Sequence, residues 1–175
     1  MTPEEQEAKF ASIAAGLPAD SRYRTLLRQV LERLPEGWDE FRTFDVQLEA
    51  GKPRRGYASA FRFEAFESGG DCDEARSEQT WVVTFHPEWL DGFNDLAVMW
   101  TIAHELGHVA SGCRCGSLVM GGRPMTRVRG LEEESYREVT AAEQMFNERM
   151  ADAIARAWGF WREEEAFEKM FQDAQ

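Results

Sequence analysis

Hydrophobic residues in the first part of the chain recur with the spacing of amphipathic helices. The clearest stripe follows the i, i+3, i+4, i+7 rule and consists of Tyr23, Leu26, Leu27, Val30, Leu31 and Leu34. The segment Pro35-Glu36-Gly37 ends this helix. An earlier helix is expected to begin at Thr2-Pro3-Glu4-Glu5, which has the composition of a capping box, and to end near Gly16. We therefore expect N-terminal helices within residues 1–36.

Between residues 41 and 86 the pattern changes to that of β-strands. Phe44, Val46 and Leu48 alternate with polar residues, and the segments 57–66 and 80–85 have the composition of two further strands. These segments predict a small twisted sheet of about three strands. The strand nearest the next helix, Trp81–Phe85, is our candidate for its edge strand.

Two long helices are predicted after the sheet, over residues 94–112 and 131–160. Ser111-Gly112 ends the first, which is apolar on nearly all sides. The buried side of the second is expected to consist of Ala141, Met145, Ala151, Ile154, Ala155 and Trp158. Beyond it, residues 163–165 resemble a solvated helix end, with Phe167, Met170 and Phe171 packing back. The whole pattern predicts an α+β fold in one domain over residues 1–175.

Composition narrows the classes of partner. The 32 acidic and 20 basic residues give a net charge of −12, which argues against nucleic acid and against an anionic membrane surface. The acidic N-terminus lacks the pattern of a signal peptide, and the longest apolar run, Leu96–Ala103, is too short to span a bilayer. We therefore expect a cytoplasmic protein with reduced cysteines and leave its oligomeric state open.

The motif that carries chemistry is His104-Glu105-Leu106-Gly107-His108, which spells HExxH within the first long helix. Residues four apart lie one turn above each other, so both imidazoles can reach one metal ion, with Glu105 beside them. Two of the three histidines of the chain fall in this motif. Gly107 lowers the stability of the helix, but it lets another segment approach closely. The motif predicts one Zn²⁺ per chain, bound in part by His104 and His108, with Glu105 as general base.

A catalytic zinc site needs a third protein ligand. The pattern HExxHxxGxxH is excluded because Ser111 and Arg114 stand where it requires Gly and His. Glu148, on the core side of the second long helix, is our preferred ligand, and Glu143 on the same helix competes with it. His86 and Cys115 are more distant alternatives, since His86 is expected to be a surface or turn histidine.

The segment Asn147-Glu148-Arg149-Met150-Ala151-Asp152 reads NExxxD and resembles the gluzincin pattern. The residues from Trp100 to His108 resemble the motif helix of ImmA/IrrE-type peptidase domains, and the likeness extends over about 60 residues. It implies a zincin-like fold, zinc bound by His104, His108 and Glu148, and Asp152 hydrogen-bonded to a motif histidine. The stretch between His108 and Glu148 is longer than in that family and leaves room for an inserted loop.

These residues predict a zinc metallopeptidase that hydrolyses a protein or peptide substrate. We expect this substrate to be one specific intracellular protein. Tyr136, Arg137 and an arginine-rich segment at 113–130 are candidates for contacts with the oxyanion or the substrate. Two other hypotheses stay open: a catalytically silent zincin-fold module that binds or regulates a partner, and an exported effector protease.

Overall fold

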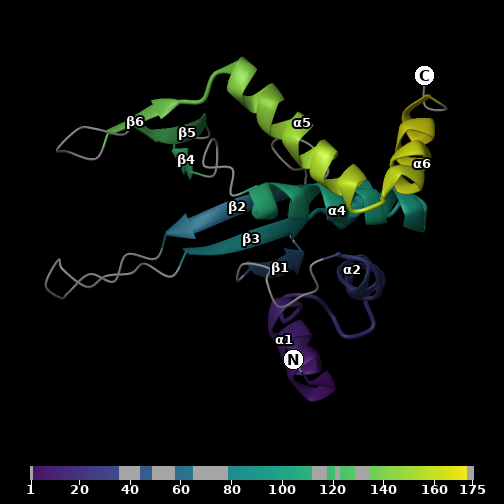
Figure 1. Ribbon diagram of the computed structural model, residues 1–175. Helices are drawn as coiled ribbons and strands as arrows, with labels where there is room; N and C mark the ends of the chain where they lie inside the picture. Colours follow the sequence, from purple (N-terminus) through teal and green to yellow (C-terminus); the bar gives the residue numbers. More distant parts are fainter. Residues whose placement is uncertain are drawn as a thin grey trace, which may run out of the picture.

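The computed structural model describes residues 2–35, 44–48, 58–64, 79–111, 118–120, 123–128 and 135–172. Helices and strands occur together, so the predicted α+β class is confirmed (Figure 1). Within the described residues no helix is long and apolar enough to cross a membrane.

The two predicted N-terminal helices are confirmed as α1 (Pro3–Ile13) and α2 (Arg22–Glu32). Thr2 and Glu5 form both hydrogen bonds of the capping box that begins α1. Ser21 caps α2, whose apolar stripe is buried as the spacing predicted. Together these helices cover one side of the core beneath the sheet and α4 (Figure 1).

The predicted sheet has three strands: β1 (Phe44–Leu48), β2 (Ala58–Glu64) and β3 (Gln79–Phe85). Their order is β1-β3-β2, with β1 parallel and β2 antiparallel to β3. The prediction that Trp81–Phe85 is an edge strand is therefore wrong, because β3 is the central strand. Val83, Thr84 and Phe85 are all buried, as expected of a strand with both faces covered.

The helix α4 (Asp95–Ser111) is the centre of the fold and confirms the first predicted long helix. The short helix α3 (Pro87–Leu90) precedes it. Figure 1 shows α4 between the sheet and α2 on one side and the last two helices on the other. Its buried residues on several faces explain why its sequence is apolar nearly all round.

Along the chain, a second sheet is formed between α4 and the helix that carries Glu148. The sequence predicted a loop in this stretch, followed by a helix from residue 131. Its strands are β4 (Leu118–Met120), β5 (Arg123–Val128) and β6 (Ser135–Glu138), in that order and antiparallel. The helix predicted from residue 131 therefore begins only at Ala141, as α5 (Ala141–Ala157). The reason is local, since Thr140 and Glu143 form a capping box that fixes the start of α5.

The predicted buried side of α5 is only partly correct. Ala151 and Ala155 are fully buried, and Ile154 and Trp158 are partly buried. Ala141 and Met145 are exposed because they lie in the N-terminal half of α5, which extends beyond α4 toward the second sheet (Figure 1).

The chain turns at Gly159, whose φ is 88°, and continues as α6 (Trp161–Gln172). Phe167 packs against the core as predicted, with its ring edge-on to Phe93 at 5.7 Å. Residues 163–165 do not form a uniformly solvated helix end, because Glu163 is buried. Its carboxylate binds Arg33, at the end of α2, with a distance of 2.5 Å between Oε1 and Nη1. This ion pair compensates the burial of the charge.

Candidate metal centre

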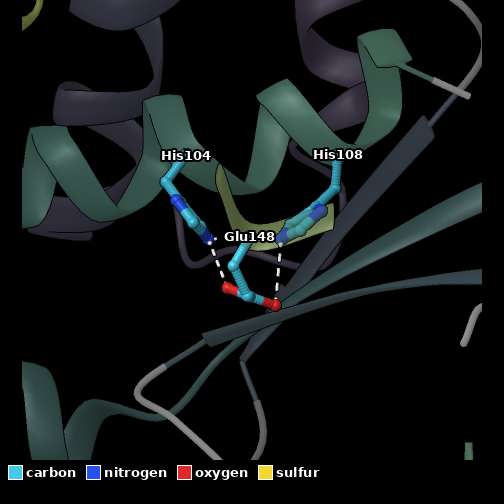
Figure 2. A group of neighbouring side chains, drawn as sticks. All are labelled: His104, His108 and Glu148. Atoms are coloured by element: carbon cyan, nitrogen blue, oxygen red, sulfur yellow. Dashed lines mark hydrogen bonds and ion pairs between the residues drawn. The ribbon is translucent and has the colours of Figure 1, made fainter. Parts of the chain in front are cut away.

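His104 and His108 lie on successive turns of α4, and their rings point to the same side of the helix (Figure 2). Their side chains are only 16% and 14% exposed. The two Nε2 atoms are 3.2 Å apart. The i, i+4 spacing of the motif thus brings both nitrogens to one point, as predicted.

Glu148 reaches the same point from α5 (Figure 2). Its Oε2 lies 3.1 Å from Nε2 of His104, and its Oε1 lies 3.7 Å from Nε2 of His108. Among the described residues, these three form the group whose ligand atoms all lie within 4.8 Å of one another. The third residue predicted for the site is therefore brought to the two histidines.

Asp152, one turn after Glu148, contacts the other nitrogen of His104. Its Oδ1 lies 2.8 Å from Nδ1. An ionised carboxylate only accepts hydrogen bonds, so Nδ1 carries the proton and donates it. In neutral His104 the lone pair is consequently on Nε2, which is the nitrogen that faces His108 and Glu148.

The pKa values of His104 and Glu148 are both shifted by their neighbours in this cluster. A bare Nε2 of His104 would face the carboxylate of Glu148 with no positive charge between them. Burial disfavours the charged ring, but hydrogen bonds to Asp152 and Glu148, together with the charge of Glu105, outweigh burial and raise the pKa of His104 to about 9. The hydrogen bond from His104 and the nearby ring of His108 hold the pKa of Glu148 well below its usual range. Both shifts show that a positive charge is favoured at the point where these side chains meet.

The contacts between the two imidazole nitrogens and the carboxylate oxygens of Glu148 fit zinc. With zinc–ligand bonds of about 2.05 Å and tetrahedral angles, neighbouring donor atoms lie about 3.3 Å apart. The two Nε2 atoms are 3.2 Å apart, and each faces its own oxygen of Glu148, at 3.1 Å for His104 and 3.7 Å for His108, so these contacts lie close to this value. Neutral imidazole nitrogen and carboxylate oxygen are also donors that zinc accepts.

The prediction that Glu148 and Asp152 lie on the core side of their helix needs correction. Their side chains are 61% and 30% exposed. The buried stripe of α5 is Asn147, Ala151 and Ala155, so Glu148 and Asp152 lie one position further round, at the flank of the contact with α4. The Glu148 side chain is thus accessible to solvent at the edge of the contact between α4 and α5.

Gly107 explains why α5 can approach α4 so closely. A Cβ atom at this position would lie 2.7 Å from the carbonyl oxygen of Ala151 and 3.0 Å from its Cα. The close approach that the sequence predicted for Gly107 is therefore present, and the approaching segment is the helix that carries Glu148.

Glu105, the predicted general base, is buried with 6% exposure and acts electrostatically on the ring of His104. Trp100, one turn before His104, lies with its ring centre 6.4 Å from that of the histidine. The sequence indicated only that Trp100 belongs to an apolar helix. Its position i−4 to a motif histidine was the available signal for this contact.

The competing ligands do not join this group. Glu143 accepts hydrogen bonds from both the backbone N–H and the hydroxyl of Thr140, so its carboxylate caps α5. His86 was predicted to be a surface or turn histidine. It lies at the turn between β3 and α3, as the N-cap of α3, but it is buried. It lies outside the metal-ligating group found among the described residues. Cys115 lies outside the described residues.

Tyr136 and Arg137 lie on β6, opposite Arg127 and Thr126 of β5, and not on a helix as the sequence predicted. The backbone therefore brings them just before α5, while their contact with an oxyanion stays a prediction. Of the arginine-rich segment, only β4 and β5 belong to the described residues.

Comparison of the chain with protein-family models, with curated proteins and with solved structures finds no match.

Proposed function

We propose that this protein is a zinc-dependent metallopeptidase with a zincin-like fold. The observation that carries the proposal is the convergence of His104 Nε2, His108 Nε2 and the Glu148 carboxylate at separations suited to one tetrahedral zinc ion. Three protein ligands and a solvent-accessible side are the pattern of catalytic zinc sites, whereas structural sites are closed by a fourth ligand.

The residues of the site would have separate roles in peptide hydrolysis. When bound, zinc would lower the pKa of a coordinated water and polarise the carbonyl of the substrate. Glu105 would accept a proton from the attacking water and return it to the leaving amine. Asp152 would keep His104 in the tautomer that presents Nε2 to the metal.

The arrangement of the first sheet supports a peptide as substrate. The strand β2 is at one edge of the sheet, and it packs beside α4. An extended peptide that pairs with an edge strand is held through its main chain, with little demand on its sequence. Since β3 is the central strand, we propose the edge strand β2 for this pairing.

The resemblance of the motif helices to ImmA/IrrE-type domains supports a more specific role. Those domains are small intracellular peptidases, and several act on a partner regulator. We therefore propose a dedicated protein substrate in the cytoplasm.

The metal is tested first, by elemental analysis of untagged protein as purified and after incubation with zinc and removal of the excess. Wild type should hold about one zinc per chain, Glu148→Ala should lose it, and the capping-residue control Glu143→Ala should retain it. Activity is then tested on zinc-loaded protein with a library of unstructured peptides. Cleavage by wild type and its loss in Glu105→Gln with zinc still bound would support a peptidase. Wild type that holds no zinc after incubation would overturn the proposal, and the binding-module hypothesis would replace it.

A further inference from the structure

Gly107 is the place where the two helices of the candidate site come closest. The atoms that a Cβ would meet there are the carbonyl oxygen, Cα and carbonyl carbon of Ala151, at 2.7, 3.0 and 3.2 Å. All three belong to the backbone, so a change of side-chain rotamer cannot make room. The only relief is a movement of one helix relative to the other.

The backbone conformation of Gly107 does not itself require glycine. Among the described residues, the glycine with positive φ is Gly159, whereas Gly107 lies within α4. Inside a helix, glycine is less favourable than every residue except proline. The contact with Ala151 is therefore the physical reason for glycine at this position.

The contact is also adjacent in sequence to the residues of the metal-ligating group. Gly107 immediately precedes His108, and Ala151 is three residues after Glu148 and one before Asp152. A movement of α5 at Ala151 consequently displaces both carboxylates from the histidines of α4. The distances from the two carboxylates to the histidines therefore depend on the small size of residue 107.

We infer that Gly107 is a positioning residue, which sets the spacing of α4 and α5 so that Glu148 and Asp152 reach the metal-binding histidines. This inference rests on the proposed zinc site and adds a determinant of its affinity outside the ligands. Ordinary Cβ contacts begin at 3.4 Å, so a methyl group at position 107 would require α5 to retreat by roughly 0.7 Å. Functional constellations tolerate only about 0.5 Å of displacement.

The test is the zinc affinity of Gly107→Ala, measured by competition with a chromophoric chelator, beside Gly92→Ala. Gly92 precedes α4, its φ is not in the left-handed region, and an added Cβ there meets nothing within 4 Å. We expect Gly107→Ala to bind zinc at least tenfold more weakly, while Gly92→Ala binds as wild type does. Circular dichroism of the metal-free proteins establishes that the comparison is made between folded chains. Folded Gly107→Ala with wild-type affinity would overturn the inference.

A double-mutant cycle separates positioning from a general loss of stability. If Gly107 acts through the carboxylates, Asp152→Asn should weaken zinc binding much less in the Gly107→Ala background than in wild type. Fully additive effects would contradict this. Should Gly107→Ala fail to fold, Ala151→Ser, which adds one atom to the fully buried residue whose backbone meets Gly107, replaces it. Weaker zinc binding by folded Ala151→Ser supports the inference, and unchanged binding overturns it.

A readout without metal keeps this inference distinct from the proposed function. The side-chain Nδ1–H of His104, hydrogen-bonded to Asp152, is observable by NMR in the metal-free protein. Its signal should shift or exchange away in Gly107→Ala and persist in Gly92→Ala. If wild type binds no zinc, the proposed function fails, and this signal still decides whether Gly107 positions α5.

Discussion

The carboxylate of Asp152 on α5 lies 2.8 Å from Nδ1 of His104 on α4. This hydrogen bond fixes the tautomer and the orientation of the ring, so that Nε2 faces His108 and Glu148. A residue that does not contact the metal position is thereby expected to control zinc affinity.

Replacing Asp152 by Asn should weaken zinc binding by about 10- to 100-fold, because an uncharged amide supports the ring less well. Chelator competition at pH 7 measures the change. Asp20→Asn, which removes the same charge from an exposed position, is the matched control and should bind zinc as wild type does. Equal affinities of the two variants would show that the hydrogen bond to His104 contributes nothing to the site.

Zinc affinity should rise with pH. Although burial opposes its charge, hydrogen bonds to Asp152 and Glu148 raise the pKa of His104 to about 9, so the metal-free ring holds a proton at pH 7. Zinc must displace that proton, and its affinity should therefore increase up to about tenfold per pH unit below pH 9. Calorimetry at pH 7.5 in buffers of different ionisation enthalpy should detect the release of about one proton. Affinity that is independent of pH between 7 and 8.5 would contradict this protonation state.

The stability of the metal-free protein should change with pH in the opposite direction. The pKa of His104 is raised above its ordinary value of 6.5, so its contribution is fully present below pH 6.5 and is lost as pH rises through about 9. The hydrogen bond from His104 and the nearby ring of His108 lower the pKa of Glu148, whose contribution is lost as pH falls below 4.5. Thermal unfolding with a chelator present should show a Tm that falls from pH 6.5 to 9. The fall should be smaller in His104→Gln, and an equal fall in both would assign it to other groups.

The residues of the site could be predicted from the sequence because their geometry is mostly local. Helical spacing alone places His104 and His108 on one face, and it relates Glu148 to Asp152. The sequence also distinguishes Glu148 from Glu143 as the third ligand. Thr140-Ala-Ala-Glu143 has the pattern of a capping box, which assigns the carboxylate of Glu143 to the start of the helix. The same capping box marks the start of α5 at Ala141.

The errors arose where the structure depends on contacts between distant segments. The composition of Trp81–Phe85 predicts a strand, but which strands flank it depends on pairing with residues far away in the sequence. The second sheet was missed for the same reason, because its short strands are defined by pairing with one another. The exposure of Met145 depends on where α4 ends beside α5, which the periodicity of α5 does not contain.

The burial of Glu163 was missed in the same way, and it leads to a prediction about stability. Its carboxylate binds Arg33, whose guanidinium also lies 4.0 Å from the ring centre of Phe160 and donates a hydrogen bond to the carbonyl of Gly159. Arg33 thus joins the end of α2 to the start of α6. Arg33→Ala would leave a buried carboxylate without this partner and should lower the free energy of unfolding by about 1–3 kcal/mol.

Urea denaturation of the metal-free protein measures this loss, with Lys169→Ala as the control. Lys169 forms an exposed i, i+4 pair with Glu165, and removing it should change the free energy of unfolding by less than about 0.5 kcal/mol. Zinc affinity should be unchanged in both variants, because neither residue contacts the candidate site. Equal stability of the two variants would mean that water replaces Arg33 at Glu163, and weaker zinc binding by Arg33→Ala alone would connect the packing of α6 to the site through α4.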